Sequence, residues 1–238
     1  MEVVISGASK GIGRRTSEKL LEKGHEVWGI ARSEDLLHEI ERRYRGFHPV
    51  VADLTSVEGV RKAASSLPES FDVLVNNLGG ASYSPLDKIS PEEVDRLVKL
   101  NLTAPIMLTT SLLGRIKRSV VFVISDIVYA RMPGLTIYGS AKVALDYFAD
   151  SLRAETHLKV CKVYLPFVKT SFWEHPSFRD VEFGPIVLKT SLDRAADAVV
   201  RCVERGGGSV HIPAWVSLAK MICGVYRPVF KLKKKNDR

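Results

Sequence analysis

The sequence predicts a doubly wound α/β domain, in which a parallel sheet of about seven strands is flanked by helices on both faces. Short apolar runs alternate with longer segments of helical period along most of the 238 residues, and this alternation is typical of parallel strands connected by helices. The run 120–124 is apolar at every position, as expected for a central strand that is covered on both faces.

The apolar runs predict strands over residues 3–6, 26–31, 47–51, 73–76, 119–125, 160–165 and 209–212. Between them, the helical period predicts helices over residues 12–23, 34–43, 57–66, 91–117, 138–157 and 192–205. Gly24 ends the first helix, and Ser90 followed by Pro91 begins the fourth, because serine caps a helix and proline fits its first position. No repeat or linker precedes residue 213, so we predict one domain over residues 1–212 and a tail over residues 213–238.

The composition, with 45% hydrophobic and 26% charged residues, is that of a soluble globular protein, and we expect it to be cytoplasmic. No window holds about 18 uninterrupted apolar residues, so we expect no spanning helix, and the N-terminus shows no secretory signal. The three cysteines, Cys161, Cys202 and Cys223, are not in metal-binding spacing. We therefore expect reduced, buried thiols and no metal site.

Most of the net charge of +8 lies in the tail, which holds seven basic residues and one acidic residue from position 214 onward. A nearly neutral body argues against nucleic-acid binding. Within the tail, Trp215, Leu218, Ile222 and Val225 fall on one side of a predicted helix. Such a basic amphipathic helix can lie on an anionic membrane surface, or it can pack over the substrate site or a neighbouring subunit. The sequence leaves both interpretations open.

The turn after the first strand is rich in glycine and predicts a dinucleotide site. Its glycines allow a tight turn and a close approach of backbone N–H groups to a pyrophosphate, and the following helix adds positive potential. The alternative is an ordinary glycine-rich turn without a ligand. The predicted contacts are Gly7, Ser9, Lys10, Gly11, Ile12 and Gly13.

Two bases near this turn favour NADP(H) over NAD. Arg32 follows the second strand, where an NAD-binding site has an acid, and a base here can pair with a 2′-phosphate. Lys10 can reach the same phosphate, although either side chain can also be a solvated surface base. Asp53 and Leu54 follow the third strand, where Asp53 can bind the adenine amino group or simply cap a helix.

A tyrosine and a lysine four residues apart predict acid–base chemistry. Tyr138 and Lys142 share one face of a predicted helix. A tyrosine with a pKa of about 10 is a poor catalyst at neutral pH, and we expect the Lys142 ammonium to lower the pKa of Tyr138. Ser125 ends the fifth strand, where its hydroxyl can bind a substrate carbonyl. The Tyr-x-x-x-Lys pattern alone also occurs on helices without catalytic function.

Taken together, these motifs over about residues 2–212 resemble the short-chain dehydrogenase/reductase family. The resemblance rests on the glycine turn, Asn76-Asn77-x-Gly79, Asn101, Ser125 and Tyr138-x-x-x-Lys142, in that order. The resemblance implies a Rossmann-like fold and hydride transfer. It implies that Tyr138 is the acid/base and that Ser125 orients the carbonyl. It also implies that Lys142 binds the nicotinamide ribose and tunes the pKa of Tyr138, and that Asn101 holds a water in the proton relay. Asn77, Gly79, Val168 and Thr170 are then further cofactor contacts.

Two positions depart from the pattern of the family. Leu78 stands where the family has alanine, which places a bulkier side chain near the cofactor, and Leu165-Pro166 replaces the usual Pro-Gly after the sixth strand. Both changes bear on the shape of the nicotinamide pocket rather than on the chemistry.

We therefore expect an oxidoreductase that acts between NADP(H) and a carbonyl or alcohol. Aromatic residues in the segment 167–189 (Phe172, Trp173, Phe178 and Phe183) suggest a fairly apolar substrate, although they can equally pack a lid onto the body. The alternatives are a membrane-surface reductase of a lipid-like ketone and a cofactor-binding regulator without turnover. The resemblance also implies a homodimer or homotetramer through the two long helices, 91–117 and 138–157.

Overall fold

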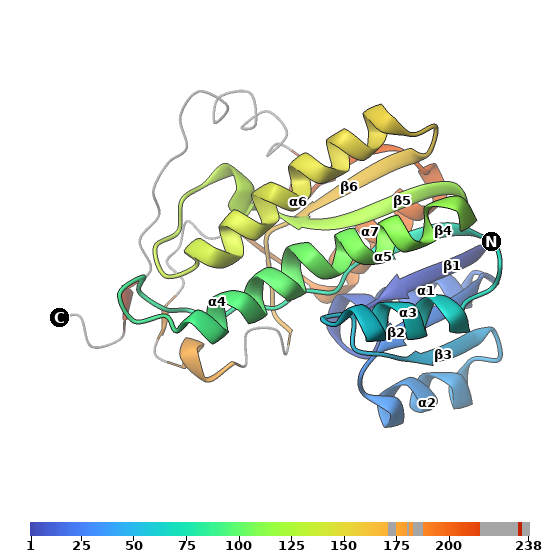
Figure 1. Cartoon of the computed structure of the whole chain (residues 1–238), viewed down its shortest axis with the longest axis horizontal. Coiled ribbons are helices and arrows are strands. Elements are labelled where there is room, and N and C mark those ends of the chain that lie inside the picture. The colour runs from blue at the N-terminus through green and yellow to red at the C-terminus, as the bar shows by residue number, and fades with distance from the viewer. Residues whose placement is uncertain (171–174, 180, 183–187, 215–232, 235–238) are drawn as a thin grey trace.

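A computed structural model describes residues 1–170, 175–179, 181–182, 188–214 and 233–234. Its centre is a seven-stranded sheet in the order β10-β6-β5-β4-β1-β2-β3 (Figure 1), and all neighbouring strands are parallel. The strands are β1 (Glu2–Ser6), β2 (Glu26–Ala31), β3 (Phe47–Val51), β4 (Phe71–Asn76), β5 (Ile116–Ser125), β6 (Lys159–Leu165) and β10 (Gly208–His211). The predicted fold class is confirmed, and the predicted strands agree to within three residues at each end.

Helices cover both faces of the sheet (Figure 1). They are α1 (Gly11–Glu22), α2 (Glu34–Arg43), α3 (Val57–Ser66), α4 (Pro91–Val98), α5 (Ala104–Leu112), α6 (Thr136–Glu155) and α7 (Leu192–Arg205). Helices α3, α5 and α6 pack on one face with Val4, Leu74 and Phe122, and α1, α2 and α7 pack on the other with Val3 and Val75. Because alternate residues of a strand point to opposite faces, the consecutive valines Val3 and Val4 pack in two separate hydrophobic cores, one on each face of the sheet.

The predicted helix over residues 91–117 is not one regular helix. A π-helical turn, η1 (Lys99–Thr103), separates α4 from α5, a 3-10 turn, η2 (Leu113–Arg115), follows, and β5 already begins at Ile116. The side-chain amide of Asn101 donates to the carbonyls of Leu97 at 2.9 Å and Gly80 at 2.7 Å. The bond to Gly80, 21 positions away, is the tertiary contact that accompanies the extra residue in the turn, which hydrophobic periodicity does not reveal.

The segment Pro91–Arg115 is long and apolar enough to cross a bilayer when judged by length and composition alone. In this fold, however, Leu97, Ala104, Leu108 and Leu112 are all buried, and the last three of them belong to the core cluster over one face of the sheet. A core helix of this kind satisfies the same criteria of length and composition.

Short strands lie beyond the C-terminal ends of the main sheet. β7 (Phe167–Val168) pairs with β9 (Lys189–Thr190), and β8 (Val181–Glu182) pairs in antiparallel fashion with β11 (Lys233–Lys234) of the tail. The predicted amphipathic helix of the tail and the aromatic residues Phe172, Trp173 and Phe183 lie outside the described residues. The pairing of β11 with β8 brings the end of the tail to the segment 167–189.

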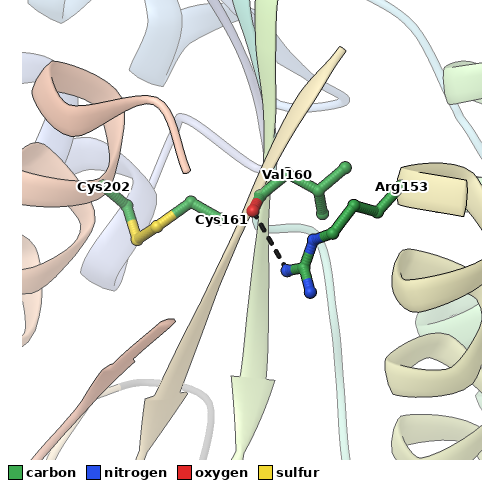
Figure 2. Close-up of a disulfide and its surroundings, with 4 residues drawn as sticks. All are labelled: Arg153, Val160, Cys161 and Cys202. Atoms are coloured by element: carbon green, nitrogen blue, oxygen red, sulfur yellow. Dashed lines mark hydrogen bonds between the residues drawn. A yellow bond between two sulfur atoms is a disulfide. The ribbon is translucent and has the colours of Figure 1, made fainter. Parts of the chain in front are cut away.

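The expectation of reduced thiols is wrong for two of the three cysteines. Cys161 of β6 and Cys202 of α7 form a disulfide, with a Cα–Cα distance of 5.7 Å (Figure 2). Both residues are fully buried. On the other side of β6, Arg153 of α6 donates to the carbonyl of Val160 at 3.2 Å. Because the two cysteines are 41 positions apart, only the packing of α7 on the sheet brings them together. Cys223 lies outside the described residues.

This disulfide should contribute measurably to stability. We expect the double substitution Cys161→Ala and Cys202→Ala to lower the free energy of unfolding by about 4 kcal/mol, because a bridge that closes a loop of this length restricts the unfolded chain by about that amount. Denaturant unfolding measures the difference. Thiol titration in denaturant should find one free thiol per wild-type chain, and three free thiols would contradict the bridge.

Candidate active site

The turn between β1 and α1 is held tight by its glycines and by Asn77. Gly7 and Gly11 have φ values of +70° and +54°, which favour glycine. A Cβ atom on Gly13 would collide with the carbonyl oxygen of Gly7 and with Nδ2 of Asn77. That Nδ2 donates to the carbonyls of Ser6 at 3.0 Å and Gly7 at 3.2 Å. The turn therefore leaves its backbone open toward the space above the sheet.

A cavity of about 570 Å³ opens at the carboxyl ends of the strands, a size typical of sites for cofactors and small molecules. It lies where the strand order reverses between β4 and β1, the usual ligand position in such sheets. Thirteen of the predicted site residues line it: Gly7, Ser9, Lys10, Gly11, Ile12, Arg32, Asn77, Gly79, Ser125, Tyr138, Lys142, Val168 and Thr170. One cavity thus joins the glycine turn to the Tyr138–Lys142 pair.

Four predicted residues do not line the cavity. Gly13 lies beneath the turn, and the side chain of Leu54 packs in the core. Asp53 accepts hydrogen bonds from the backbone N–H and the hydroxyl of Thr55 at 3.0 and 2.7 Å. Its carboxylate also lies 3.8 Å from the guanidinium of Arg32. Asp53 thus partly neutralises the base on which the preference for NADP(H) depends.

The fourth residue, Asn101, lies behind the cavity wall and is fully buried. Its Oδ1 accepts from the backbone N–H of Gly80 at 3.2 Å. A Cβ atom on Gly79 would lie 2.9 Å from Asn101 Oδ1 and 3.5 Å from Lys142 Nζ. The missing side chain of Gly79 therefore lets the Asn101 amide and the Lys142 ammonium approach the same space.

Tyr138, Ser125 and Lys142 come together from α6 and the end of β5. The hydroxyl of Tyr138 is hydrogen-bonded to that of Ser125. Lys142 Nζ lies 5.9 Å from the centroid of the Tyr138 ring and donates to the carbonyl of Val123 at 3.1 Å. Both Tyr138 and Lys142 are buried. A proton donor, a carbonyl-binding hydroxyl and a cation thus share one end of the cavity.

Contrary to our expectation from the nearby Lys142 ammonium, the pKa of Tyr138 is not lowered below its ordinary value. Burial raises the pKa of Tyr138 above its ordinary value, and the charge of Asp126 raises it further, while the hydrogen bond to Ser125 acts in the opposite direction. Burial also lowers the pKa of Lys142 to about 8. The physical reason is that removing both groups from water disfavours phenolate and ammonium alike.

Sequence reasoning missed several residues of the cavity wall. Asp126 directly follows Ser125 and begins the short helix η3 (Asp126–Tyr129), and burial raises the pKa of its carboxyl to about 7. Ile127, Met132 and Leu135 line the same end of the cavity and belong to an apolar cluster with Tyr138. The acid next to Ser125 was visible in the sequence, but its burial was not. Leu78 also lines the cavity, as its position suggested.

Comparison with known proteins agrees with this geometry. The short chain dehydrogenase family profile matches residues 2–177. An NADPH-dependent 3-dehydrocapnine reductase of Ornithobacterium rhinotracheale is 31% identical over 219 residues, which cover 82% of this chain and 76% of that protein. A serine 3-dehydrogenase of Rhizobium radiobacter is 31% identical over 169 residues, 68% of each chain.

Solved structures share the fold. A short-chain dehydrogenase from Sphingobium yanoikuyae in complex with NADPH superposes with a TM-score of 0.77 at 24% identity, over 94% of both chains. Serine dehydrogenase complexed with NADP+ gives a TM-score of 0.78 at 20% identity, over 89% of this chain and 94% of that one. With its glycine turn, its Tyr-x-x-x-Lys pair and its parallel sheet, this chain belongs to the short-chain dehydrogenase/reductase family of oxidoreductases.

Asp126 should make stability depend on pH. Its folded pKa of about 7 lies above the ordinary value of about 3.9, so the folded state binds the proton more tightly and loses stability as pH rises from about 4 to 7. We expect Asp126→Asn to raise the unfolding temperature at pH 8, with a difference that shrinks toward pH 4. Asp87→Asn, which removes an exposed carboxylate, should show no such trend. A pH-independent difference between Asp126→Asn and wild type would contradict the assigned burial.

Proposed function

We propose that this protein transfers a hydride between NADP(H) and a carbonyl or alcohol substrate. The observation that carries the proposal is that the hydrogen-bonded pair Ser125–Tyr138, with Lys142 beside it, opens into the same cavity as the glycine turn. This arrangement supports catalysis over the alternative of a cofactor-binding regulator, because every group that the reaction needs is in reach.

The cavity fits a nicotinamide dinucleotide. At one end, the tight turn at Gly7 and Gly11 leaves room for a pyrophosphate at the start of α1, where N–H groups and the helix dipole favour anions. Thr170 lies over this turn, because a Cβ atom on Gly11 would be 3.5 Å from the Cβ of Thr170. At the other end, Tyr138 and Lys142 can hold the nicotinamide ribose. When bound, the cofactor supplies or accepts the hydride.

The side chains of the protein perform the proton transfer. In the reducing direction, Ser125 donates a hydrogen bond to the carbonyl oxygen, and Tyr138 gives its proton to that oxygen as the C=O bond becomes CH–OH. Lys142 is the cation beside the phenolate that remains, and in this proposal it offsets part of the cost of burying that charge. In this proposal a water held by Asn101, whose side chain is fixed by its bonds to Gly80 and Leu97, returns the proton. In the oxidising direction each step is reversed.

The choice of NADP(H) follows from the charges at the adenosine end. Lys10 and Arg32 line the cavity, and both are exposed enough to reach a 2′-phosphate. Asp53 remains near Arg32 but is itself bonded to Thr55. The NADPH-dependent reductase among the relatives and the NADP(H) complexes among the similar structures support the same choice. The names of the relatives differ in substrate, so the substrate must be inferred from the cavity itself.

We propose that the protein forms a homo-oligomer and that its tail packs on the protein rather than on a membrane. On α6, Val143, Phe148 and Leu152 pack against or within the core, but Tyr147 is 76% exposed, which supports a homo-oligomer through this helix. The pairing of β11 with β8 supports a packing function for the tail. The membrane-surface alternative rests on the charge of the tail and on its predicted amphipathic helix, which lies outside the described residues.

Removal of the Tyr138 hydroxyl should abolish most of the turnover. We expect Tyr138→Phe to lower the turnover number by roughly 10²–10⁴-fold, the usual contribution of general acid–base catalysis, with NADPH binding nearly unchanged. The assay is NADPH oxidation with a panel of carbonyl compounds. Tyr147→Phe, on the exposed face of the same helix, is the matched control. Near-native turnover by Tyr138→Phe would disprove the mechanism.

Reversal of the charge at Arg32 should weaken the preference for NADP(H). Arg32→Asp places a second carboxylate beside Asp53 where the 2′-phosphate would bind, so like charges meet. We expect the ratio of kcat/KM for NADPH to that for NADH to fall by about tenfold or more, the value of a charged hydrogen bond. Arg42→Asp, an exposed change on α2, should leave the ratio unchanged. Equal binding of NADH and NADPH by the wild type would refute the assignment.

A further inference from the structure

The carboxylate of Asp126 has no function in the mechanism described above, yet it lines the reactive end of the cavity. Desolvation disfavours its charged form, and an ionised carboxylate at such a place destabilises a fold when no positive charge compensates it. The carboxylate accepts hydrogen bonds from the Ser125 hydroxyl and from the backbone N–H groups of Asp126 and Ile127, which favour the charged form but do not outweigh desolvation. None of these partners carries a positive charge, so this acid is a candidate for binding a cationic ligand.

Within the described part of the chain, no cation forms an ion pair with Asp126. Two basic residues of the cavity wall already have other partners. Lys142 Nζ donates to the carbonyl of Val123. Arg96 pairs with Glu93 through Nε at 2.6 Å and through a terminal nitrogen at 2.7 Å. Lys10 and Arg32 belong to the adenosine end. The imidazole of His175, which also lines the cavity, is bonded to Ser177 at 2.8 Å. A positive partner for the ionised form of Asp126 would therefore come with a ligand.

The charge of Asp126 also opposes the chemistry of its neighbour. It raises the pKa of Tyr138 and so disfavours the phenolate that oxidation of an alcohol requires. A cation placed on Asp126 would cancel this effect while the substrate is bound. Recognition of the substrate and activation of Tyr138 would then depend on the same charge.

We infer that Asp126 binds an ammonium group on the carbon next to the reacting carbon, so that the substrates are vicinal amino alcohols and the corresponding amino ketones. Asp126 Oδ1 lies 3.4 Å from Ser125 Oγ. An oxygen and a nitrogen on adjacent carbons are separated by about one hydrogen-bond length, so one substrate can reach both side chains at once. The wall of Ile127, Met132 and Leu135 suits an apolar remainder. The inference rests on the proposed function, and the ammonium itself is unchanged by the reaction.

The test compares two alcohols of nearly equal shape, norephedrine and 2-methyl-1-phenylpropan-1-ol, in which a methyl group replaces the amine. With NADP+ and the wild-type enzyme near neutral pH, we expect kcat/KM for norephedrine to be higher by about tenfold or more, the value of a hydrogen bond between charged groups. Asp126→Asn should bring the ratio of the two kcat/KM values close to one, and Asp87→Asn should keep the wild-type ratio. Equal use of both alcohols by the wild type, or an unchanged ratio in Asp126→Asn, would overturn the inference.

A binding measurement separates this inference from the proposed function. Calorimetry with and without NADP+ should show tighter binding of norephedrine than of its methyl analogue to the wild type, and no difference for Asp126→Asn. Absence of NADP+ binding or of turnover with both alcohols would count against the proposed function. Equal affinity of the wild type for the two alcohols would count against Asp126 as an ammonium site, whatever the turnover.

Discussion

The hydrogen bonds from Asn77 to the β1–α1 turn are the constraint on which the rest of the site depends. Asn77 follows β4, and its side-chain amide donates to the carbonyls of Ser6 and Gly7 at the end of β1. The backbone N–H of Asn77 in turn donates to Ser6 Oγ at 3.1 Å. These bonds join the two strands between which the strand order reverses. Helices leave in opposite directions from this point, and the crevice that results is where a ligand can enter.

The second level of organisation is electrostatic. Tyr138 and Lys142 are buried at one end of the cavity, and Asp126 lies partly buried beside them. Desolvation shifts the pKa of each group in the direction that favours its neutral form. With pKa values of about 7 and about 8, Asp126 and Lys142 exchange protons readily near neutral pH, whereas Tyr138 stays protonated until a substrate takes its proton. The same burial means that any charge brought by a substrate acts strongly on all three groups. Affinity and reactivity are therefore coupled at this end of the cavity.

Away from the cavity, a disulfide and several salt bridges hold α7 to β6 and to α1. The disulfide between Cys161 and Cys202 fixes α7 to β6, and α7 also packs closely on α1. Salt bridges from Arg15 and Lys19 of α1 to Asp193 and Asp197 of α7 extend this contact to the surface. Since α1 begins at the glycine turn, a rigid α1–α7 layer also keeps the anion-binding end of α1 in position.

The sequence by itself determined the fold class, the seven main strands and most helix boundaries, because these follow from local periodicity and from residues such as Gly24 and Ser90 at helix ends. It also identified the residues at strand ends, since Gly7, Asn77 and Ser125 stand next to apolar runs whose ends must meet at one edge of a parallel sheet. Only the tertiary structure decided the disulfide, the π-helical turn at Asn101, the direction of the pKa shift of Tyr138 and the burial of Asp126. These four features depend on desolvation or on contacts between positions far apart in the chain. The pattern of neighbouring residues in the sequence shows neither desolvation nor such contacts.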